Sequence, residues 1–289
     1  MFIVPPPLVP GARVAVVAPA GPFDRPSFER GLELLKGRYQ PVFSEHLFDT
    51  HRYLAGTDAV RGAQLQHALD DQAIKAIFAA RGGYGAMRLL PSLKLTEPKW
   101  LVGFSDITAL HLAAQVKGWQ SLHAPVLTQL GKQSPEVVTR FFDALEGKGV
   151  PKLSGTTTVV EGVAEGTLLG GNLSVLTRLI GTKWMPSLRG AVLLIEDVGE
   201  RPYRLDRMWM HLKLSGSLEG VAGIAFGEFT GCDEKDAGYG SADVMHEFAR
   251  ELGVPCAAGF LIGHGDVNEP VILGARVRLN ATARTVSAA

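Results

Sequence analysis

Strand-like apolar segments alternate with helix-like segments through the first half of the chain. The strand-like segments occupy residues 13–18, 40–43, 76–80 and 100–104 and are bounded by glycine, proline or polar residues. Residues 28–36 and 57–70 have the apolar spacing of amphipathic helices. Apolar strands separated by helices are typical of a parallel sheet that is covered on both faces. The first half is therefore predicted to be an α/β/α sandwich.

The pattern changes near residue 151. Two helices are expected in the second half, at residues 172–180 and 204–213, among short β-rich segments at 156–160, 191–195, 223–226 and 271–279. Glycine, lysine and proline at residues 147–151 resemble a linker. The expected organisation is a domain at residues 1–150, a linker at 151–164 and a β-rich α+β domain with a mixed sheet at 165–289.

Composition and charge narrow the range of partners. The 289 residues include 46% hydrophobic and 20% charged residues, which is ordinary for a globular protein with a sizeable core. Lys plus Arg equals Asp plus Glu, so we expect neither a nucleic-acid nor an anionic-membrane partner. The chain has no run of eighteen apolar residues and no basic region before its first apolar segment. These features predict a cytoplasmic protein, with Cys232 and Cys256 as reduced structural thiols.

Ser105 stands between the apolar segment 100–104 and a helix-like segment at 105–114. A serine in this position can be a helix N-cap. It can also be a nucleophile that is raised to the edge of a sheet on a sharp turn. The surrounding GFSD does not match the hydrolase pattern G-x-S-x-G, so the position alone leaves both interpretations open.

A glycine-rich loop, RGGYG at residues 81–85, directly follows the apolar segment 76–80. A phosphate-binding loop is disfavoured because Arg88 stands where the last glycine of G-x-G-x-x-G would be, and no Gly-Lys-Ser/Thr ending follows. Loops that leave the carboxyl ends of strands in one sheet lie close together. We therefore expect this loop to offer backbone donors beside Ser105.

Glu196 and His264 are the acid and base candidates in the second half. Glu196 ends the apolar segment 191–195, which would hold a carboxylate rigidly, although such an acid often only marks where a strand meets solvent. His264 lies between two glycines on turning backbone and suits a general base. The histidines show no paired metal-binding spacing, so no metal site is expected.

Seven segments in this order resemble the LD-carboxypeptidase family, which includes murein tetrapeptide carboxypeptidases and microcin C self-immunity peptidases. They cover nearly the whole chain: VAVVAPAGPF (14–23), YLAGTDAVR (53–61), ARGGYGAMRLL (80–90), GFSDITAL (103–110), EGTLLGGNLSVLTRLIGTKWMP (165–186), LLIEDVGERPYRLDRM (193–208) and GHGDVNEPVILGA (263–275). The resemblance implies an N-terminal Rossmann- or flavodoxin-like sandwich that carries a serine, and a C-terminal β-rich domain that carries a glutamate and a histidine.

The family's catalytic triad matches Ser105, Glu196 and His264, with Glu200 as the competitor for the acid. Its oxyanion donors would be the backbone amides of Asp106 and of Gly83, which is favoured over the neighbouring glycine at position 82. The activity implied is removal of the terminal D-alanine from the murein tetrapeptide L-Ala-γ-D-Glu-diaminopimelate-D-Ala during peptidoglycan recycling. This acyl-enzyme route needs no metal or organic cofactor. The resemblance also suggests a homodimer.

The sequence leaves open two other functions and the residue that holds the substrate's carboxylate. A relative of the microcin immunity enzymes would cleave an amide in a peptidyl or aminoacyl nucleotide. A non-catalytic ligand-binding module would use Ser105 only as a helix cap. The substrate's free carboxylate calls for a cationic side chain, for which Arg81, Arg201 and Arg204 are candidates.

Overall fold

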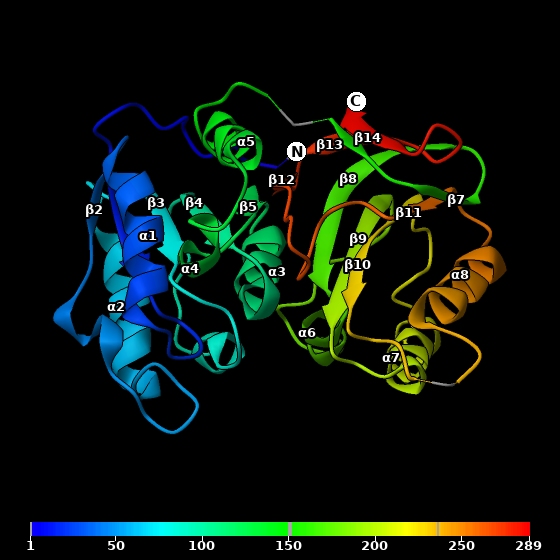
Figure 1. The fold of residues 1–289 in the computed structure, drawn as a ribbon, viewed down its shortest axis with the longest axis horizontal. Coiled ribbons are helices and arrows are strands. Elements are labelled where there is room, and N and C mark those ends of the chain that lie inside the picture. Colours follow the sequence, from blue (N-terminus) through cyan, green and yellow to red (C-terminus); the bar gives the residue numbers. More distant parts are fainter. Residues whose placement is uncertain (1, 150–151, 236) are drawn as a thin grey trace.

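The computed structural model describes residues 2–149, 152–235 and 237–289. Two sheets lie side by side, the N-terminal one on the left of Figure 1 and the C-terminal one on the right, with helix α3 between them. The predicted α/β fold with two domains, a mostly parallel first sheet and a mixed second sheet, is confirmed. The expected boundary near residues 150 and 151 lies outside the described residues.

The first sheet has six strands in the order β12-β5-β4-β3-β1-β2, and only β12 is antiparallel to its neighbour. Its first five strands in the chain are β1 (Arg13–Val17), β2 (Gln40–Val42), β3 (Ala76–Ala79), β4 (Trp100–Gly103) and β5 (Ser121–His123). β3 and β4 are buried at every position, which agrees with a sheet covered on both faces.

Helices and short 3-10 turns follow these strands. The helices are α1 (Arg25–Lys36), α2 (Asp58–Asp70), α3 (Thr108–Val116), α4 (Leu127–Leu130) and α5 (Pro135–Leu145), and the turns are η1 (Glu45–Phe48), η2 (Ala86–Leu89) and η3 (Ser105–Ile107). Side-chain caps define several starts. The Asp24 carboxylate accepts the Ser27 amide at 2.8 Å where α1 begins, and Ser134 caps α5 in the same way.

The second sheet has eight strands in the order β6-β14-β13-β8-β9-β10-β11-β7. In chain order they are β6 (Leu153–Ser154), β7 (Thr157–Val160), β8 (Val163–Asn172), β9 (Ala191–Val198), β10 (Gly223–Thr230), β11 (Cys256–Ala258), β13 (Arg276–Asn280) and β14 (Thr285–Ala288). The four central strands β8 to β11 are parallel, and each outer strand is antiparallel to the strand beside it. The segment expected as a linker therefore includes two strands of this sheet.

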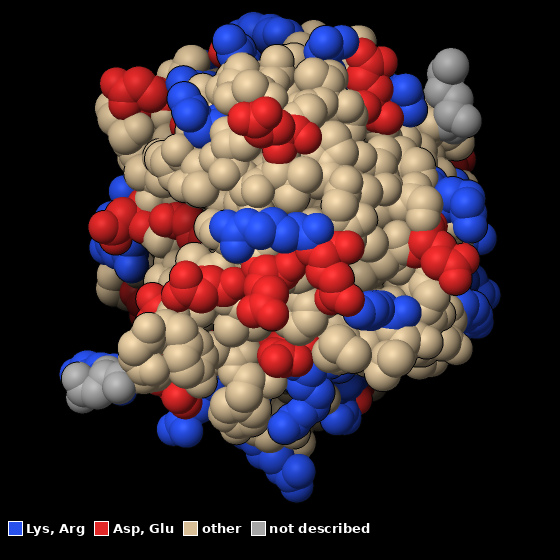
Figure 2. Space-filling model, turned by 90° about the vertical axis from the view of Figure 1, so that its right-hand side faces the viewer, with Lys and Arg blue, Asp and Glu red and all other residues tan. Residues whose placement is uncertain are grey.

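Helices α6 (Leu173–Arg178), α7 (Pro202–Leu214) and α8 (Ser241–Leu252) belong to the second lobe. α7 and α8 lie together at the right of Figure 1. On the face that includes them, acidic side chains gather in a band with basic side chains around it, so no continuous basic surface covers this face (Figure 2). No helix in the described ranges is long and apolar enough to cross a membrane.

The single strand expected at residues 271–279 is two strands that belong to different sheets. β12 (Val271–Leu273) pairs with β5 of the first sheet, whereas β13 pairs with β8 and β14 of the second. Gly274, with φ +87°, makes the turn that separates them. The chain therefore crosses from the second sheet back to the first between β11 and β12, at residues 259–270.

A close contact docks α3 onto the end of β8. The Asn172 amide donates to Thr108 Oγ1 at 3.0 Å, and this bond is buried. A Cβ at Gly171 would lie 2.7 Å from the same oxygen, so only glycine allows the two backbones to approach this closely. This contact places the turn before α3 beside the ends of the central strands of the second sheet.

Candidate active site

Ser105 stands on a turn between β4 and α3, with its backbone in the left-handed region at φ 64°. A non-glycine residue in this region costs about 1–2 kcal/mol, and such outliers cluster at functional sites. The same conformation lifts the nucleophile in the strand-to-helix turns of other hydrolases. The preceding residue, Phe104, is buried and fixes the base of the turn. The side chain of Ser105 is thus presented at the carboxyl edge of the first sheet.

The structure brings His264 between Ser105 and Glu196. His264 Nε2 lies 3.0 Å from Ser105 Oγ, and His264 Nδ1 lies 2.7 Å from Glu196 Oε2. The carboxylate can only accept, so Nδ1 carries the proton and Nε2 is left as the acceptor for the serine hydroxyl. His264 is 159 positions from Ser105 and 68 positions from Glu196 in the chain, yet the three side chains form one continuous hydrogen-bonded series.

Glu196 lies within β9, two residues before the strand ends, and its side chain is fully buried. The strand continues past the end expected from the sequence, so the acid sits on regular strand backbone. Its second oxygen, Oε1, has no hydrogen-bond partner among the described residues. Glu200 lies elsewhere, where it accepts from Ser174 Oγ and from Arg204 Nη1, both at 3.3 Å.

The loop that carries His264 is held at several points. The Gly263 amide donates to Asn268 Oδ1 at 3.0 Å, and the Gly265 amide donates to the Glu228 carboxylate at 3.2 Å. The imidazole ring packs against Phe104 with 4.7 Å between ring centroids, and 14% of the side chain is exposed. Burial raises the pKa of the Glu228 carboxyl. The sequence did not point to Glu228 as a site residue, because its place after an apolar run was its only distinguishing feature.

The glycine loop lies directly against the nucleophile turn. A Cβ at Gly82 would meet Ser105 Cβ at 2.9 Å and Oγ at 3.1 Å. The carboxylate of Asp106 reaches back to this loop and accepts the Ala86 amide at 2.7 Å. The side chain of Asp106 thus ties the turn that follows β4 to the loop that follows β3.

Arg61 is a buried cation behind the same loop, with 1% of the residue exposed. Its guanidinium donates to the carbonyl oxygens of Pro19 and Gly85 and pairs with Asp58. Burial raises the pKa of the Asp106 carboxyl to about 6, although the Ala86 amide and the charge of Arg61 act in the opposite direction. Nothing in the spacing of these residues indicated this network.

A pocket of about 500 Å³ opens in front of Ser105 and His264. Arg81 lines it, with its guanidinium bonded to the Pro22 carbonyl, and Lys132 lines it as well. The other two arginines expected to hold substrate do not line this pocket. Arg201 pairs with Glu234 at 3.6 Å and Arg204 with Glu200 at 3.3 Å. Lys132 was not anticipated from the sequence.

Two other histidines, His111 and His123, lie behind Phe104 in the core. His111 bonds to Ser121 Oγ and to the Gly103 carbonyl, whereas both ring nitrogens of His123 lack a partner among the described residues. Burial holds the pKa of His123 well below its usual value. Within the described ranges no group of three or more histidine, cysteine, aspartate or glutamate side chains is arranged to hold a metal ion.

Comparison with known proteins identifies the family. The N-terminal domain model of LD-carboxypeptidases matches residues 14–124, and the C-terminal domain model matches residues 165–279. The chain belongs to the LD-carboxypeptidase family. Among curated relatives, a putative carboxypeptidase of Synechocystis sp. is 38% identical over 99% of this chain and 97% of its own. The murein tetrapeptide carboxypeptidase of Pseudomonas aeruginosa is 32% identical over 89% of each chain.

The fold of this LD-carboxypeptidase family member is also shared with a solved relative. The crystal structure of muramoyltetrapeptide carboxypeptidase from Oxalobacter formigenes has a TM-score of 0.83 and 28% identity, covering 95% of this chain and 97% of that one. The resemblance seen in the sequence motifs is therefore confirmed for the family and the fold.

Proposed function

We propose that the protein is a serine LD-carboxypeptidase that removes the terminal D-alanine from murein tetrapeptide, with Ser105 as nucleophile, His264 as base and Glu196 as the acid that orients it. The observation that carries the proposal is the placement of His264 within hydrogen-bonding distance of both partners. Membership of the carboxypeptidase family and the murein peptide names of the relatives support the substrate class.

In the proposed reaction, Ser105 Oγ attacks the carbonyl carbon of the scissile amide while His264 Nε2 takes the hydroxyl proton. Glu196 accepts the Nδ1 proton in a hydrogen bond and stabilises the imidazolium that forms. His264 then gives its proton to the leaving amine of D-alanine, which leaves an ester on Ser105. A water molecule, deprotonated by His264, attacks this ester and restores the serine.

The developing oxyanion requires donors beside Ser105. The Asp106 amide lies in the first turn after the nucleophile. Gly82 places its carbonyl oxygen on the Gly21 amide at 3.0 Å. Because the N–H and C=O of a trans peptide point in opposite directions, the Gly83 amide of the same peptide points away from Gly21. Gly83 is proposed as the second donor because its amide is directed away from Gly21 and belongs to the loop that contacts Ser105.

Two cations support the binding of a free carboxylate in the pocket. Arg81 and Lys132 both line it beside Ser105, and no aspartate or glutamate other than Asp24 does so. A carboxylate one residue beyond the scissile bond would be attracted by this pair. The finer specificity for diaminopimelate belongs to the same proposal, as do a cytoplasmic location, a homodimer and a reaction without a metal or organic cofactor.

The proposal is tested by incubating the purified full-length protein with murein tripeptide, tetrapeptide and pentapeptide and analysing the products by mass spectrometry. We expect loss of one alanine from the tetrapeptide alone. Ser105→Ala is expected to abolish release while circular dichroism stays unchanged, and unchanged hydrolysis by this variant would refute the serine mechanism. Cleavage of an aminoacyl sulfamoyl adenylate without cleavage of the tetrapeptide would favour the microcin-immunity activity instead.

A further inference from the structure

A second pocket lies away from the proposed catalytic residues and shares no lining residue with the pocket at Ser105. Its volume is about 500 Å³, within the range of about 300–1,000 Å³ that is common for small-molecule sites. It sits against α2, the segment between η2 and β4, and the final turns of α3. α3 begins beside Ser105 and ends at this pocket, so the two sites lie toward opposite ends of one helix.

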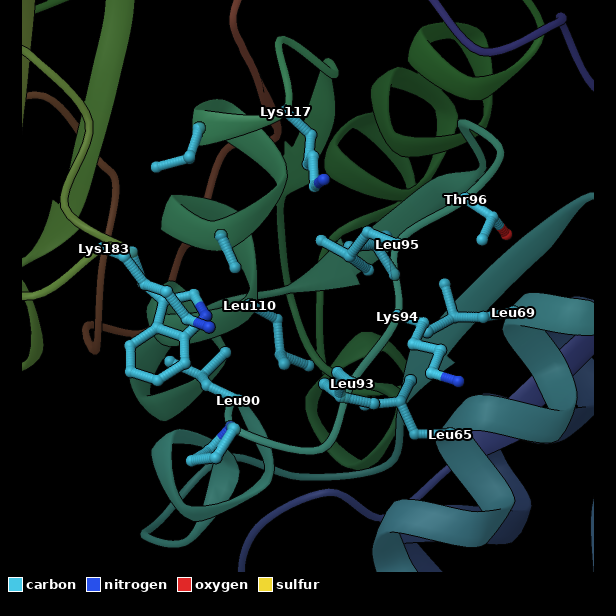
Figure 3. Close-up of a pocket in the computed structure, with 15 residues that line it drawn as sticks. Leu65, Leu69, Leu90, Leu93, Lys94, Leu95, Thr96, Leu110, Lys117 and Lys183 are labelled. Atoms are coloured by element: carbon cyan, nitrogen blue, oxygen red, sulfur yellow. The ribbon is translucent and has the colours of Figure 1, made fainter.

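The wall of this pocket is aliphatic. Seven leucines line it, together with Ala113, Val116 and Pro91. Figure 3 shows several of these leucine side chains converging in the middle of the view. Apart from Thr96, the lining contains no hydroxyl or amide side chain. A sugar or a polar peptide would leave hydrogen-bonding groups without partners here, which disfavours both classes of ligand.

Three lysines surround the aliphatic wall. Lys183 lies on the left of Figure 3, Lys117 at the top and Lys94 on the right. No aspartate or glutamate lines the pocket, and none of the three ammonium groups forms an ion pair with the residues that the structure describes. Lys183 instead lies over the Trp184 ring, 5.0 Å from its centroid. The rim therefore carries positive charge that nothing in the lining neutralises.

We propose that this pocket binds a single free aliphatic chain that ends in an anionic group, either a carboxylate or a phosphate monoester. The chain would pack against the leucines, and the anionic group would lie among the lysines. Burial of each methylene stabilises such a complex by about 0.8 kcal/mol, so the aliphatic wall supplies affinity and the lysines supply selection for negative charge.

The pocket also joins the two lobes. Lys183 and Trp184 follow α6 of the second lobe, whereas the remaining lining residues belong to the first. A ligand in contact with both lobes would bind only while the lobes are docked. Because it would bind the folded protein and not the unfolded one, it would raise the melting temperature.

Trp184 gives a direct signal for the test. It is only partly buried, whereas the other three tryptophans, Trp100, Trp119 and Trp209, are each at most 4% exposed. Laurate, lauryl phosphate, dodecyl maltoside and dodecyltrimethylammonium carry chains of equal length with different head groups. We expect both anionic probes to bind at least about tenfold more tightly than the neutral and cationic ones. ω-Bromoundecanoate should quench the fluorescence, and Trp184→Phe should remove most of that quenching.

Single substitutions Lys94→Gln, Lys117→Gln and Lys183→Gln should each weaken laurate binding by about two- to fivefold, the usual size of a partly exposed ion pair. The exposed Lys152→Gln provides the matched control and should leave the affinity unchanged. Equal binding of laurate and dodecyl maltoside, or unchanged affinity in all three lysine variants, would overturn the proposal. Binding to anionic phospholipid vesicles without binding of free laurate would overturn it as well. Hydrolysis of murein peptides is measured separately, so its failure would not affect this result.

Discussion

The Ser105 turn and the His264 loop meet at one hydrogen bond but are built in different ways. Ser105 is positioned locally, by the end of β4, a left-handed backbone conformation and the start of α3. His264 is positioned by a segment that leaves the second sheet after β11 and joins the first sheet as β12. The nucleophile therefore depends on one strand-to-helix turn, whereas the base depends on the docking of the two lobes. Substitutions should separate effects on the local turn from effects on the docking of the lobes.

After loss of the nucleophile itself, the largest effect is expected on the acid. Glu196→Gln keeps the shape of the buried side chain but removes the charge that stabilises a protonated His264, so kcat should fall by about 10⁴-fold. Glu200→Gln is the matched control, because Glu200 bonds to Ser174 and Arg204 rather than to the histidine, and kcat should change by less than about tenfold. Steady-state kinetics on murein tetrapeptide provide the measurement. Similar losses in both variants would contradict the assignment of the acid.

A smaller effect is expected where the glycine loop touches the nucleophile. Gly82→Ala adds a Cβ that would lie 2.9 Å from Ser105 Cβ, and the φ of Gly82 is outside the left-handed region, so the contact is the main consequence. Displacement of the serine by a few tenths of an ångström should lower kcat by about 10- to 100-fold. Gly62→Ala is the matched control, because the φ of Gly62 is also outside the left-handed region and its added Cβ would meet only side-chain atoms at 3.8 and 3.9 Å. The stability of the two variants can be compared by thermal unfolding. Full activity of Gly82→Ala would show that the loop can move away without cost.

The sequence predicted the position of the Ser105 turn, which is set locally, better than that of the His264 loop, which is set by contacts between the lobes. Apolar runs located β1, β3 and β4, and the position of Ser105 after β4 followed from them. The left-handed φ of Ser105 has no sequence signature, because glycine or asparagine would be the usual residue there. The return of β12 to the first sheet was missed because an apolar run does not say which sheet it joins, and residues 271–279 read as one strand.

Residues that act through tertiary contacts were the least predictable part of the site. Arg61 reads as an exposed helix residue, yet it is buried because three backbone and carboxylate oxygens surround its guanidinium. Lys132 follows α4 and lines the same pocket as Ser105, although no motif in the sequence links the two residues. Arg201 and Arg204 shared a motif with Glu196 but lie outside the pocket, since sequence proximity does not fix the direction of a side chain. Helices α5 and α8 also went unpredicted.

The docking of the lobes is tested by Thr108→Val. This substitution keeps the side-chain volume but removes the oxygen that accepts the buried Asn172 amide. An unpartnered buried amide should lower the free energy of unfolding by about 1–3 kcal/mol. Thr139→Val removes an exposed hydroxyl bonded to Pro135 and should cost less than about 0.5 kcal/mol in urea unfolding. If both variants lose the same stability, the α3–β8 contact does not hold the lobes together.

The smallest effect concerns Asp106, which links the nucleophile turn to the glycine loop. Burial raises its carboxyl pKa from 3.8 to about 6 in the folded protein. Between these values the folded state binds more protons than the unfolded state, so this group makes stability fall as the pH rises. From about pH 5 to about pH 6.5 the loss attributable to Asp106 should be about 1 kcal/mol. Asp106→Asn keeps an acceptor for the Ala86 amide but cannot ionise, so its free energy of unfolding should decline less than that of the parent protein over this interval. Parallel urea-unfolding curves for the two proteins at both pH values would show that the buried carboxyl does not titrate there.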